Sequence, residues 1–483
     1  MTELWFESAT MLATRLKARE ISARDLLEMF LSRAAQFDGA INAIIWRDEG
    51  AARDRADAAD AAFDRGEDWG PLHGVPMTIK EAFDWVGSPS TWGDPVFKDN
   101  FPTQNADAVQ RLIDAGAVIF GKTNVPLHLS DWQSFNSIYG TTNNPWDLSR
   151  VPGGSSGGSA AALAAGMSAL EVGSDIGASI RNPAHYCGVY GHKPTWGIIR
   201  SRGALWPGQI CEDDLCVSGP LARSADDLEL ALKIMAGADQ QEAVGWTLDL
   251  PPPRQQTLAD FKVGVMLTNP NCTQDDALTE QLQRTVDALA AAGVQVDDGA
   301  RPDIDTKDAF ETYLLLLRSA TGAHAEPEAF AAFCQRAEAV TEADKSYHNL
   351  VDRGVALRHH HWLKLNEKRY QMIDAWDAWF KDYDLLLCPI AASAAFVHDQ
   401  AGQRADRTIA INQGQEPVVD QLFWAGYPNM AFLPSTVAPA GRTASGLPCG
   451  LQIVANRYRD LEAIHFARLI ADVVGGFQPP PGY

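Results

Sequence analysis

Two serines and a lysine are the residues of this 483-residue chain whose types and spacing best suit catalysis. Lys80 ends an apolar stretch that begins at Gly74, and Ser155 and Ser179 lie in two glycine-containing segments further along the chain. A serine hydroxyl becomes a strong nucleophile only when a base takes its proton. A lysine amine can be that base when burial beside apolar groups lowers its pKa. The three residues therefore predict covalent catalysis by a serine that a buried, neutral lysine activates.

The backbone around Ser179 has the composition of a site for a negatively charged oxygen. Ser179 lies just beyond the end of a predicted strand, and ligands in α/β proteins commonly bind beyond strand ends. Small residues at positions 177 and 178 permit a tight turn that brings neighbouring N–H groups together. One such donor lowers the barrier of acyl transfer by roughly 3–4 kcal/mol. We therefore expect an oxyanion hole formed by the backbone of Ile176, Gly177, Ala178 and Ser179.

The segment from Pro152 to Thr195 resembles the signature of the amidase signature family. The likeness recurs in short blocks over nearly the whole chain, at residues 121–124, 144–147, 218–223, 383–387 and 446–452. Members of that family use a Ser-cisSer-Lys triad and need no metal or other cofactor. The resemblance implies that Ser179 forms the acyl-enzyme, that Ser155 is the bridging serine with a cis peptide bond, and that Lys80 is the base.

The same resemblance implies a complete reaction. The proton of Ser179 would pass to Ser155 and on to Lys80, Ser155 would return a proton to the leaving amine, and water would release the acid. Asp175 and Arg181 flank the oxyanion loop, and the resemblance gives them a structural role as an ion pair that holds its backbone in shape.

The expected fold class is α/β, with a single large twisted, mostly parallel mixed β-sheet covered by helices on both faces. The alternation of predicted strands and helices agrees with that class. We expect one amidase domain, residues 1–483. Its parts are an N-terminal helical segment (1–65), a signature core (66–250), a helical and more variable substrate-side part (251–385), and a C-terminal return to the sheet (386–483).

Local patterns predict several elements of that fold. A capping box at Ser22 and Asp25 begins a helix with apolar residues at helical spacing. Other helices are predicted at residues 51–63, 106–115, 160–165, 277–292 and 354–381. Strands are predicted immediately before Lys80 and at residues 117–120, 169–173 and 385–388.

Two other residues compete for the catalytic roles. Lys122 also follows an apolar segment and is a rival base. Ser156 is the centre of a Gly-x-Ser-x-Gly pattern, the nucleophile elbow of α/β-hydrolases. An elbow needs a histidine later in the chain, and the candidates are His192, His324, His398 and His465. A flexible linker or a phosphate loop agrees less well, because the glycine-rich run precedes an alanine-rich helix and lacks the Gly-Lys-Ser/Thr ending.

The sequence departs from the commonest family pattern at two places. Ala178 replaces a frequent glycine, and a positive φ there would strain the backbone. Residues 129–136 differ from the Met-Gly segment of the glutamine-transferring subunits, and no Arg-Tyr-Asp-Gly block follows residue 310. These departures favour a stand-alone amidase over the amide-cleaving component of a glutamyl-tRNA amidotransferase. Such a component of a larger complex, and a catalytically silent binding protein, remain the alternatives.

The expected substrate is a small-molecule amide or carbamate. Ser130, Trp132 and Gln133 are the candidate substrate-binding residues. Trp132, Phe135 and Trp206, with several later aromatic residues, suggest a bulky apolar pocket. The candidates are therefore aryl amides, anilides and urethanes, with esters cleaved as a side reaction.

Composition limits the partners and the compartment. The formal net charge of −22 opposes binding to nucleic acid. The longest apolar stretch, near residues 160–170, is too short to span a membrane, and the N-terminus has no secretory pattern. Seven scattered cysteines fit a reducing compartment, so we expect a cytoplasmic protein, with a homodimer left open. The run His359-His360-His361 is expected on a solvated helix, where consecutive side chains diverge too far to share a metal.

Overall fold

Helices and strands alternate along the computed structural model, which describes residues 3–483. The α-helices of that range are α1 (Ala9–Lys17), α2 (Ala23–Ile41), α3 (Glu49–Asp64), α4 (Asp107–Asp114), α5 (Gly157–Ala164), α6 (Arg181–Cys187), α7 (Ala225–Met235), α8 (Asp276–Ala291), α9 (Thr306–Thr321), α10 (Pro327–Ala339), α11 (Tyr347–Val355), α12 (His359–Trp379), α13 (Leu422–Asn429) and α14 (Asp460–Val474). The strands are β1 (Ile44–Arg47), β2 (Pro76–Lys80), β3 (Val118–Thr123), β4 (Phe135–Asn136), β5 (Gly140–Thr141), β6 (Glu171–Asp175), β7 (Tyr190–Lys193), β8 (Val217–Ala222), β9 (Lys262–Val265), β10 (Gln295–Asp297), β11 (Leu385–Cys388), β12 (Thr408–Ile411), β13 (Gly414–Pro417), β14 (Ser435–Arg442) and β15 (Pro448–Val454).

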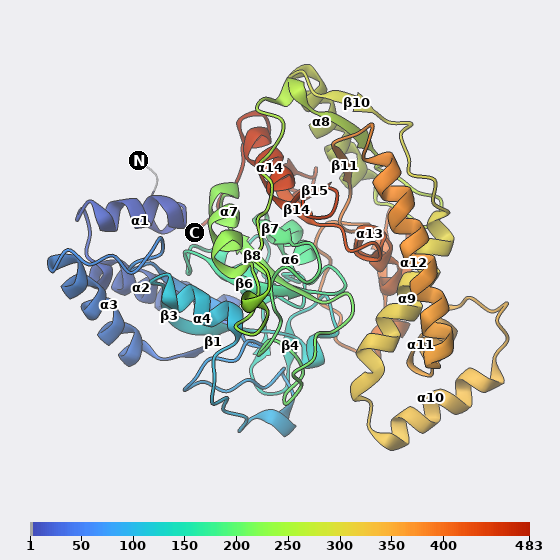
Figure 1. The fold of residues 1–483 in the computed structure, drawn as a ribbon, viewed down its shortest axis with the longest axis horizontal. Coiled ribbons are helices and arrows are strands. Elements are labelled where there is room, and N and C mark those ends of the chain that lie inside the picture. The colour runs from blue at the N-terminus through green and yellow to red at the C-terminus, as the bar shows by residue number, and fades with distance from the viewer. Residues whose placement is uncertain (1–2) are drawn as a thin grey trace.

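The main sheet of the described chain has eight strands in the order β10-β9-β11-β15-β14-β7-β8-β6. Helices flank it, and α6 and α14 both pack against β14 (Figure 1). The mixed α/β fold class is therefore confirmed. The expectation of a single sheet is wrong, because β2, which carries Lys80, belongs to a separate three-stranded sheet of order β1-β3-β2.

The expectation of mostly parallel pairing is wrong. In the eight-stranded sheet only β9 with β10 and β9 with β11 pair in parallel, and the other neighbours are antiparallel. The connections explain this, because parallel neighbours need a crossover, usually a helix, whereas antiparallel neighbours need only a turn. A short turn at residues 443–447 joins β14 to β15, and a loop without a helix joins β7 to β8.

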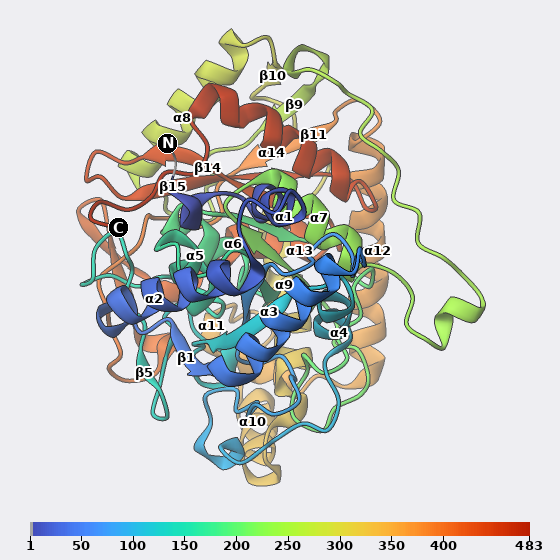
Figure 2. The ribbon, with the colours of Figure 1, turned by 90° about the vertical axis from the view of Figure 1, so that its left-hand side faces the viewer.

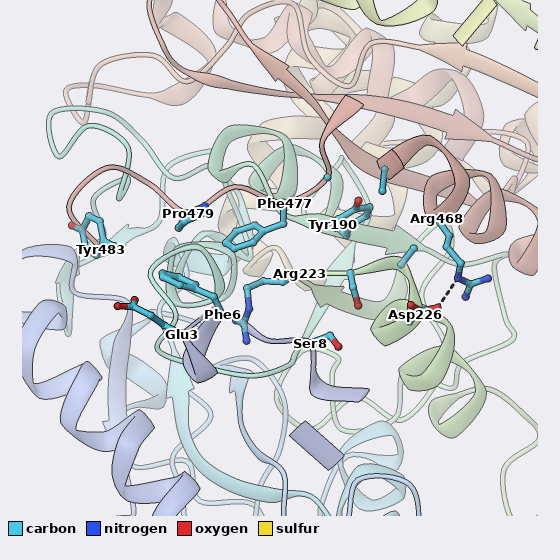
Figure 3. Close-up of a pocket in the computed structure, with 14 residues that line it drawn as sticks. Glu3, Phe6, Ser8, Tyr190, Arg223, Asp226, Arg468, Phe477, Pro479 and Tyr483 are labelled. Atoms are coloured by element: carbon cyan, nitrogen blue, oxygen red, sulfur yellow. Dashed lines mark hydrogen bonds and ion pairs between the residues drawn. The ribbon is translucent and has the colours of Figure 1, made fainter. Parts of the chain in front are cut away.

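The two ends of the described chain meet on one side of the molecule. Helices α1, α2 and α3 form that side, which faces the viewer in Figure 2. The rings of Phe6 and Phe477 lie 5.9 Å apart between centroids, and Figure 3 shows both at a cavity of about 610 Å³. The helices α9 to α12 lie on the opposite side of the molecule in Figure 1.

Most of the predicted helices are confirmed within two or three residues. Helices α3, α4, α5 and α8 agree with the expected ranges, and Gly166 adopts a positive φ of 70° just after α5. Ser22 caps α2 by accepting a hydrogen bond from the N–H of Asp25. Strand β6 lies two residues later than predicted, so it ends at Asp175, directly before the oxyanion loop.

The long helix predicted for residues 354–381 is wrong at its start. Gly354 belongs to α11, and α12 begins only at His359. The glycine lies tightly against α9, since a Cβ atom there would approach the Cβ of Arg318 to 2.5 Å. The chain therefore forms two separate helices here, α11 and α12, and both contact α9. The run His359-His360-His361 lies exposed at the first turn of α12, as expected.

No helix among residues 3–483 combines the length and the hydropathy that crossing a membrane requires.

Candidate active site

A tightly packed loop between Val151 and α5 positions Ser155. Its Gly154–Ser155 peptide bond is cis, as the resemblance implied. A Cβ atom at Gly154 would lie 2.2 Å from the carbonyl oxygen of Asp131, so only glycine fits at that point of the loop. Ser134 fastens the loop from outside, because its hydroxyl donates to the carbonyl of Gly153 and accepts from the N–H of Gly157, both at 3.1 Å.

Lys80 lies at the end of β2, with no exposed surface, and its amine meets two hydroxyl groups. Its Nζ is 2.7 Å from Ser155 Oγ and 2.9 Å from Ser174 Oγ. Ser174 belongs to β6 and is the residue before Asp175. The structure thus brings together the predicted lysine and bridging serine, and adds a second serine that the sequence did not single out.

Burial sets the charge of this lysine. It lowers the pKa of the Lys80 amine from 10.5 to about 7, although the acidic groups around it act in the opposite direction. One of those groups is Glu171, which contacts the hydroxyl of Thr78. Burial raises the pKa of the Glu171 carboxyl to about 8, so this group is mainly uncharged at pH 7. Much of the Lys80 population is therefore neutral near pH 7.

A buried ion pair shapes the loop that carries Ser179. Arg181 donates from Nε and Nη2 to the two carboxylate oxygens of Asp175, at 2.9 and 2.8 Å, and neither side chain has exposed surface. Burial alone would raise the pKa of the Asp175 carboxyl, but the charge and hydrogen bonds of Arg181 hold it below its usual value. The carboxylate also accepts from the N–H groups of Ala178 and Ile180, at 2.9 and 3.2 Å, so it closes the turn around Ser179.

One of the four N–H groups expected to form an oxyanion hole already has a hydrogen-bond partner. The N–H of Ala178 is already donated to Asp175, and its φ is 68°, the strained conformation that a glycine would adopt freely. The N–H groups of Ile176, Gly177 and Ser179 have no hydrogen-bond partner among the described residues. Three of the four expected donors are thus available to a ligand, and Ala178 shapes the loop.

Three side chains hold the carbonyl groups of the same loop. Tyr313 from α9 and Asn429 from α13 both donate to the carbonyl of Ile176, at 2.9 and 2.8 Å. Trp132 donates from Nε1 to the carbonyl of Gly177 at 2.8 Å. Trp132 was expected to contact substrate, and the structure shows its indole N–H engaged by the loop. Each held carbonyl shares a planar peptide group with the next N–H, so these contacts fix the direction of the N–H groups of Gly177 and Ala178.

The other two candidate substrate residues differ in their surroundings. Both amide atoms of Gln133 are occupied, since Nε2 donates to the carbonyl of Asp399 at 2.5 Å and Oε1 accepts from its N–H at 2.9 Å. Ser130 is exposed and donates to the carbonyl of His128. The structure therefore leaves Ser130 accessible, whereas Gln133 joins two distant loops.

The aromatic residues named with these candidates do not form one cluster. Phe135 lies in the short strand β4. Trp206 stacks on His324 at 5.0 Å and meets Trp92, Phe97 and His128 edge to face.

Comparison with known proteins identifies the family. The family model described as Amidase matches residues 25–463. The chain belongs to the amidase family. It is 31% identical over 479 residues to an indoleacetamide hydrolase of Bradyrhizobium diazoefficiens, covering 98% of this chain and 87% of that protein. It is also 31% identical to a glutamyl-tRNA(Gln) amidotransferase component of Prochlorococcus marinus, with 92% of each chain covered. A crystal structure of an amidase superposes with a TM-score of 0.79 at 25% identity, covering 97% of this chain and 100% of that one. This protein is accordingly an amidase, a hydrolase of amide C–N bonds.

The rival lysine of this amidase has other partners. Lys122 is as buried as Lys80, but its Nζ donates to the carbonyl of Pro89 at 2.6 Å and to the hydroxyl of Ser90 at 3.1 Å. Its amine therefore does not meet Ser155 or Ser179 in hydrogen-bond contact.

The nucleophile-elbow arrangement is absent around Ser156 in the part of the chain that the structure describes. Its hydroxyl is buried and has no hydrogen-bond partner there, and the residues before it form a loop instead of a strand. His192, the nearest candidate in sequence, contacts Thr436 and Asp460. Between residues 3 and 483, no group of three or more His, Cys, Asp or Glu side chains is arranged to hold a metal.

Proposed function

We propose that this amidase cleaves its substrate through an acyl-enzyme on Ser179, with Ser155 and neutral Lys80 as the proton relay. The observation that carries the proposal is the 2.7 Å contact between Lys80 Nζ and Ser155 Oγ at a fully buried amine. Burial that lowers the pKa of Lys80 to about 7 supports the neutral form that a base requires. The short segment between β6 and α6 supports the proposal, because it carries Ser179 together with Ile176 and Gly177, whose N–H groups have no hydrogen-bond partner among residues 3–483.

In the first half of the reaction, Ser179 Oγ attacks the carbonyl carbon of the amide. Its proton passes to Ser155 Oγ while the proton of Ser155 passes to the amine of Lys80, which becomes an ammonium group. The carbonyl oxygen takes up the negative charge and accepts from the N–H groups of residues 176, 177 and 179. The C–N bond then breaks, and Lys80 returns its proton through Ser155 to the leaving nitrogen.

In the second half, water attacks the ester carbonyl of the acylated Ser179. The water proton follows the same relay to Lys80, and the oxyanion is held by the same N–H groups. Collapse of this intermediate breaks the ester bond, releases the carboxylic acid and restores the proton of Ser179. The enzyme ends the cycle with neutral Lys80, so no external acid or base is consumed.

For the substrate, we propose aryl amides, anilides or carbamates, with esters as a side activity. Support comes from the buried Trp132 against the oxyanion loop and from the aromatic cluster around Trp206. We also propose that the chain acts as a stand-alone amidase in the cytoplasm on small molecules, since residues 129–136 lack the Met-Gly segment of the glutamine-transferring subunits. Turnover of an anilide or aryl carbamate that exceeds turnover of acetamide and glutamine is the expected result. A preference for the small polar amides would contradict the substrate proposal.

Labelling identifies the nucleophile directly. A fluorophosphonate should modify Ser179, as read by peptide mapping, and should abolish hydrolysis in proportion to labelling. The Ser179→Ala variant is the control and should take up no label. A label on Ser156 would instead support the elbow arrangement and overturn the assignment to Ser179.

A further inference from the structure

A second cavity lies among the helices α9 to α12, on the side of the molecule opposite the chain ends (Figure 1). Its volume is about 650 Å³. Apolar side chains from three of the helices line it, among them Leu315 of α9, Cys334 of α10 and Leu365 of α12. None of the catalytic candidates Lys80, Ser155 and Ser179 is part of the lining. The cavity is therefore a separate space with an apolar interior.

Positive charge gathers at this cavity, although the chain as a whole carries −22. Arg353, Arg358, Lys364 and Lys368 line it, together with His361. Lys368 is paired with Asp308. The other three cations form no ion pair within the described residues, and neither do the two acidic residues of the lining, which are exposed. The lining thus contains charged groups of both signs, and the cations outnumber the acidic residues.

Arg353 is a cation of this lining that lacks a hydrogen-bond acceptor for part of its guanidinium group. The Nη1 atom of its guanidinium is buried and has no hydrogen-bond partner in the part of the chain that the structure describes. A buried donor without an acceptor costs free energy, more so when it carries a charge. A carboxylate in the cavity would supply the negative charge that the Arg353 side chain lacks, and its planar shape matches the fork of a guanidinium.

The cavity between the chain ends has no excess of cations, because its lining contains two arginines and two acidic residues, Glu3 and Asp226. Figure 3 shows Arg223 and Arg468 at its wall. The Nη atoms of Arg223 donate to the carbonyls of Leu163, Ser168 and Glu7, while its buried Nε has no partner among residues 3–483. Arg468 is paired with two acidic side chains. Of these two cavities, the one lined by Arg353 combines apolar side chains with more cations than acidic residues in its lining.

We propose that the cavity between α9 and α12 is a binding site for a monocarboxylate with an apolar body. The carboxylate would lie on Arg353 with Arg358 and Lys364 at the entrance, and the apolar body would contact Leu315, Cys334 and Leu365. The ligand could derive from a flexible fatty acid or from a rigid aromatic acid, and both share this chemistry.

Calorimetry with four probes tests the chemistry of the site. Octanoate and 2-naphthoate are the two acids, and 1-octanol and octylammonium are the neutral and cationic controls. Octanoate, 2-naphthoate or both should bind with one site per chain, and the tighter of the two names the source. The alcohol and the amine should bind at least about tenfold more weakly, because they cannot pair with a guanidinium. Equal binding of octanoate and octanol would overturn the proposal.

Variants separate the cavity from nonspecific effects. Arg353→Met keeps an apolar stem and should weaken binding of the acids at least about tenfold. Arg284→Met, on the exposed face of α8, changes net charge equally and should leave binding unchanged. Leu365→Trp should fill the interior and weaken binding while it keeps every cation. Unchanged affinity in both Arg353→Met and Leu365→Trp would overturn the site.

The position of the bound acid in the cavity can be tested without measuring catalysis. A crystal of the full chain soaked with 2-bromooctanoate should show the anomalous signal of bromine between α10 and α12. A signal beside Ser179, or no ordered bromine anywhere, would show that the acid does not use this cavity.

Discussion

Strands β2 and β3 are neighbours that each carry a buried lysine, yet only β2 presents its amine to serines of the signature segment. The parallel register pairs Ile79 with Lys122 and Lys80 with Thr123. Since paired residues point to the same face of a sheet and successive residues to opposite faces, the two amines leave the sheet on opposite sides. Lys80 reaches Ser155 and Ser174, whereas Lys122 reaches Pro89 and Ser90.

The comparison separates burial from function. Burial lowers the pKa of Lys80 to about 7 and that of Lys122 to about 8. A lowered pKa alone therefore does not distinguish a base from a structural lysine. The distinguishing feature is the hydroxyl that the amine contacts. For Lys80 this is Ser155, and the next residue, Ser156, donates its N–H to the carbonyl of Ser179 at 3.1 Å.

Replacing each lysine in turn is expected to give the largest difference between the two strands. Lys80→Met should lower kcat about 10³-fold or more, because the relay loses its base. Lys122→Met should keep kcat within about threefold per folded molecule, since its amine contacts no catalytic hydroxyl. Steady-state kinetics on protein whose folding has been checked by circular dichroism would measure both. Equal losses in the two variants would remove the distinction between the strands.

The hydroxyl partners allow a second matched pair. Ser155→Ala should lower kcat about 10²-fold to 10³-fold, because the proton of Ser179 loses its route to the amine. Ser90→Ala removes the corresponding partner of Lys122 and should leave kcat nearly unchanged. A Ser155→Ala variant with full hydrolysis rates would show that Lys80 acts without a relay.

The pH dependence should follow Lys80 alone. Below pH 7 the amine gains a proton and stops being a base, so kcat/KM should fall about tenfold per pH unit and level off above pH 7. The same midpoint should persist in Lys122→Met. The same lowered pKa affects the free energy of unfolding. Between about pH 7 and the ordinary value of 10.5, the unfolded lysine holds a proton that the folded lysine has released. This group therefore increases the free energy of unfolding as the pH rises over that range. Rates that are constant down to pH 5 would contradict a neutral base.

The smallest expected effect concerns Glu171. Its carboxyl is mainly protonated at pH 7, because burial raises its pKa to about 8. Glu171→Gln resembles that neutral form and should change kcat by less than about threefold, with little change in the midpoint of the pH profile. A midpoint that falls by about a whole unit would show that Glu171 is ionised and holds Lys80 charged.

The predictable part of the site is the part encoded locally. Lys80 at a strand end, the glycine-rich run around Ser155 and the Asp175–Arg181 pair are all read from short segments or from the family likeness, and the structure brings Lys80 to Ser155 and Asp175 to Arg181. Helix boundaries with a clear cap, as at Ser22, were likewise predictable.

The missed features depend on contacts between distant segments. Tyr313 and Asn429 hold the carbonyl of Ile176 from 137 and 253 residues away, and nothing in their local sequence indicates it. The direction of strand pairing was missed for a similar reason, because an apolar strand looks alike in parallel and antiparallel sheets. The occupied N–H of Ala178 follows from side-chain geometry that composition does not contain.

The guanidinium of Arg181 also has a consequence for the order in which the enzyme matures. Its Nη1 donates to the carbonyl of Ala425 and to Gln452, which lies 271 residues further along the chain. A ribosome delivers the N-terminal residues first. The nascent polypeptide must therefore emerge past Gln452 before Arg181 acquires its full set of partners, so hydrolytic competence should arise only after that residue has left the ribosome.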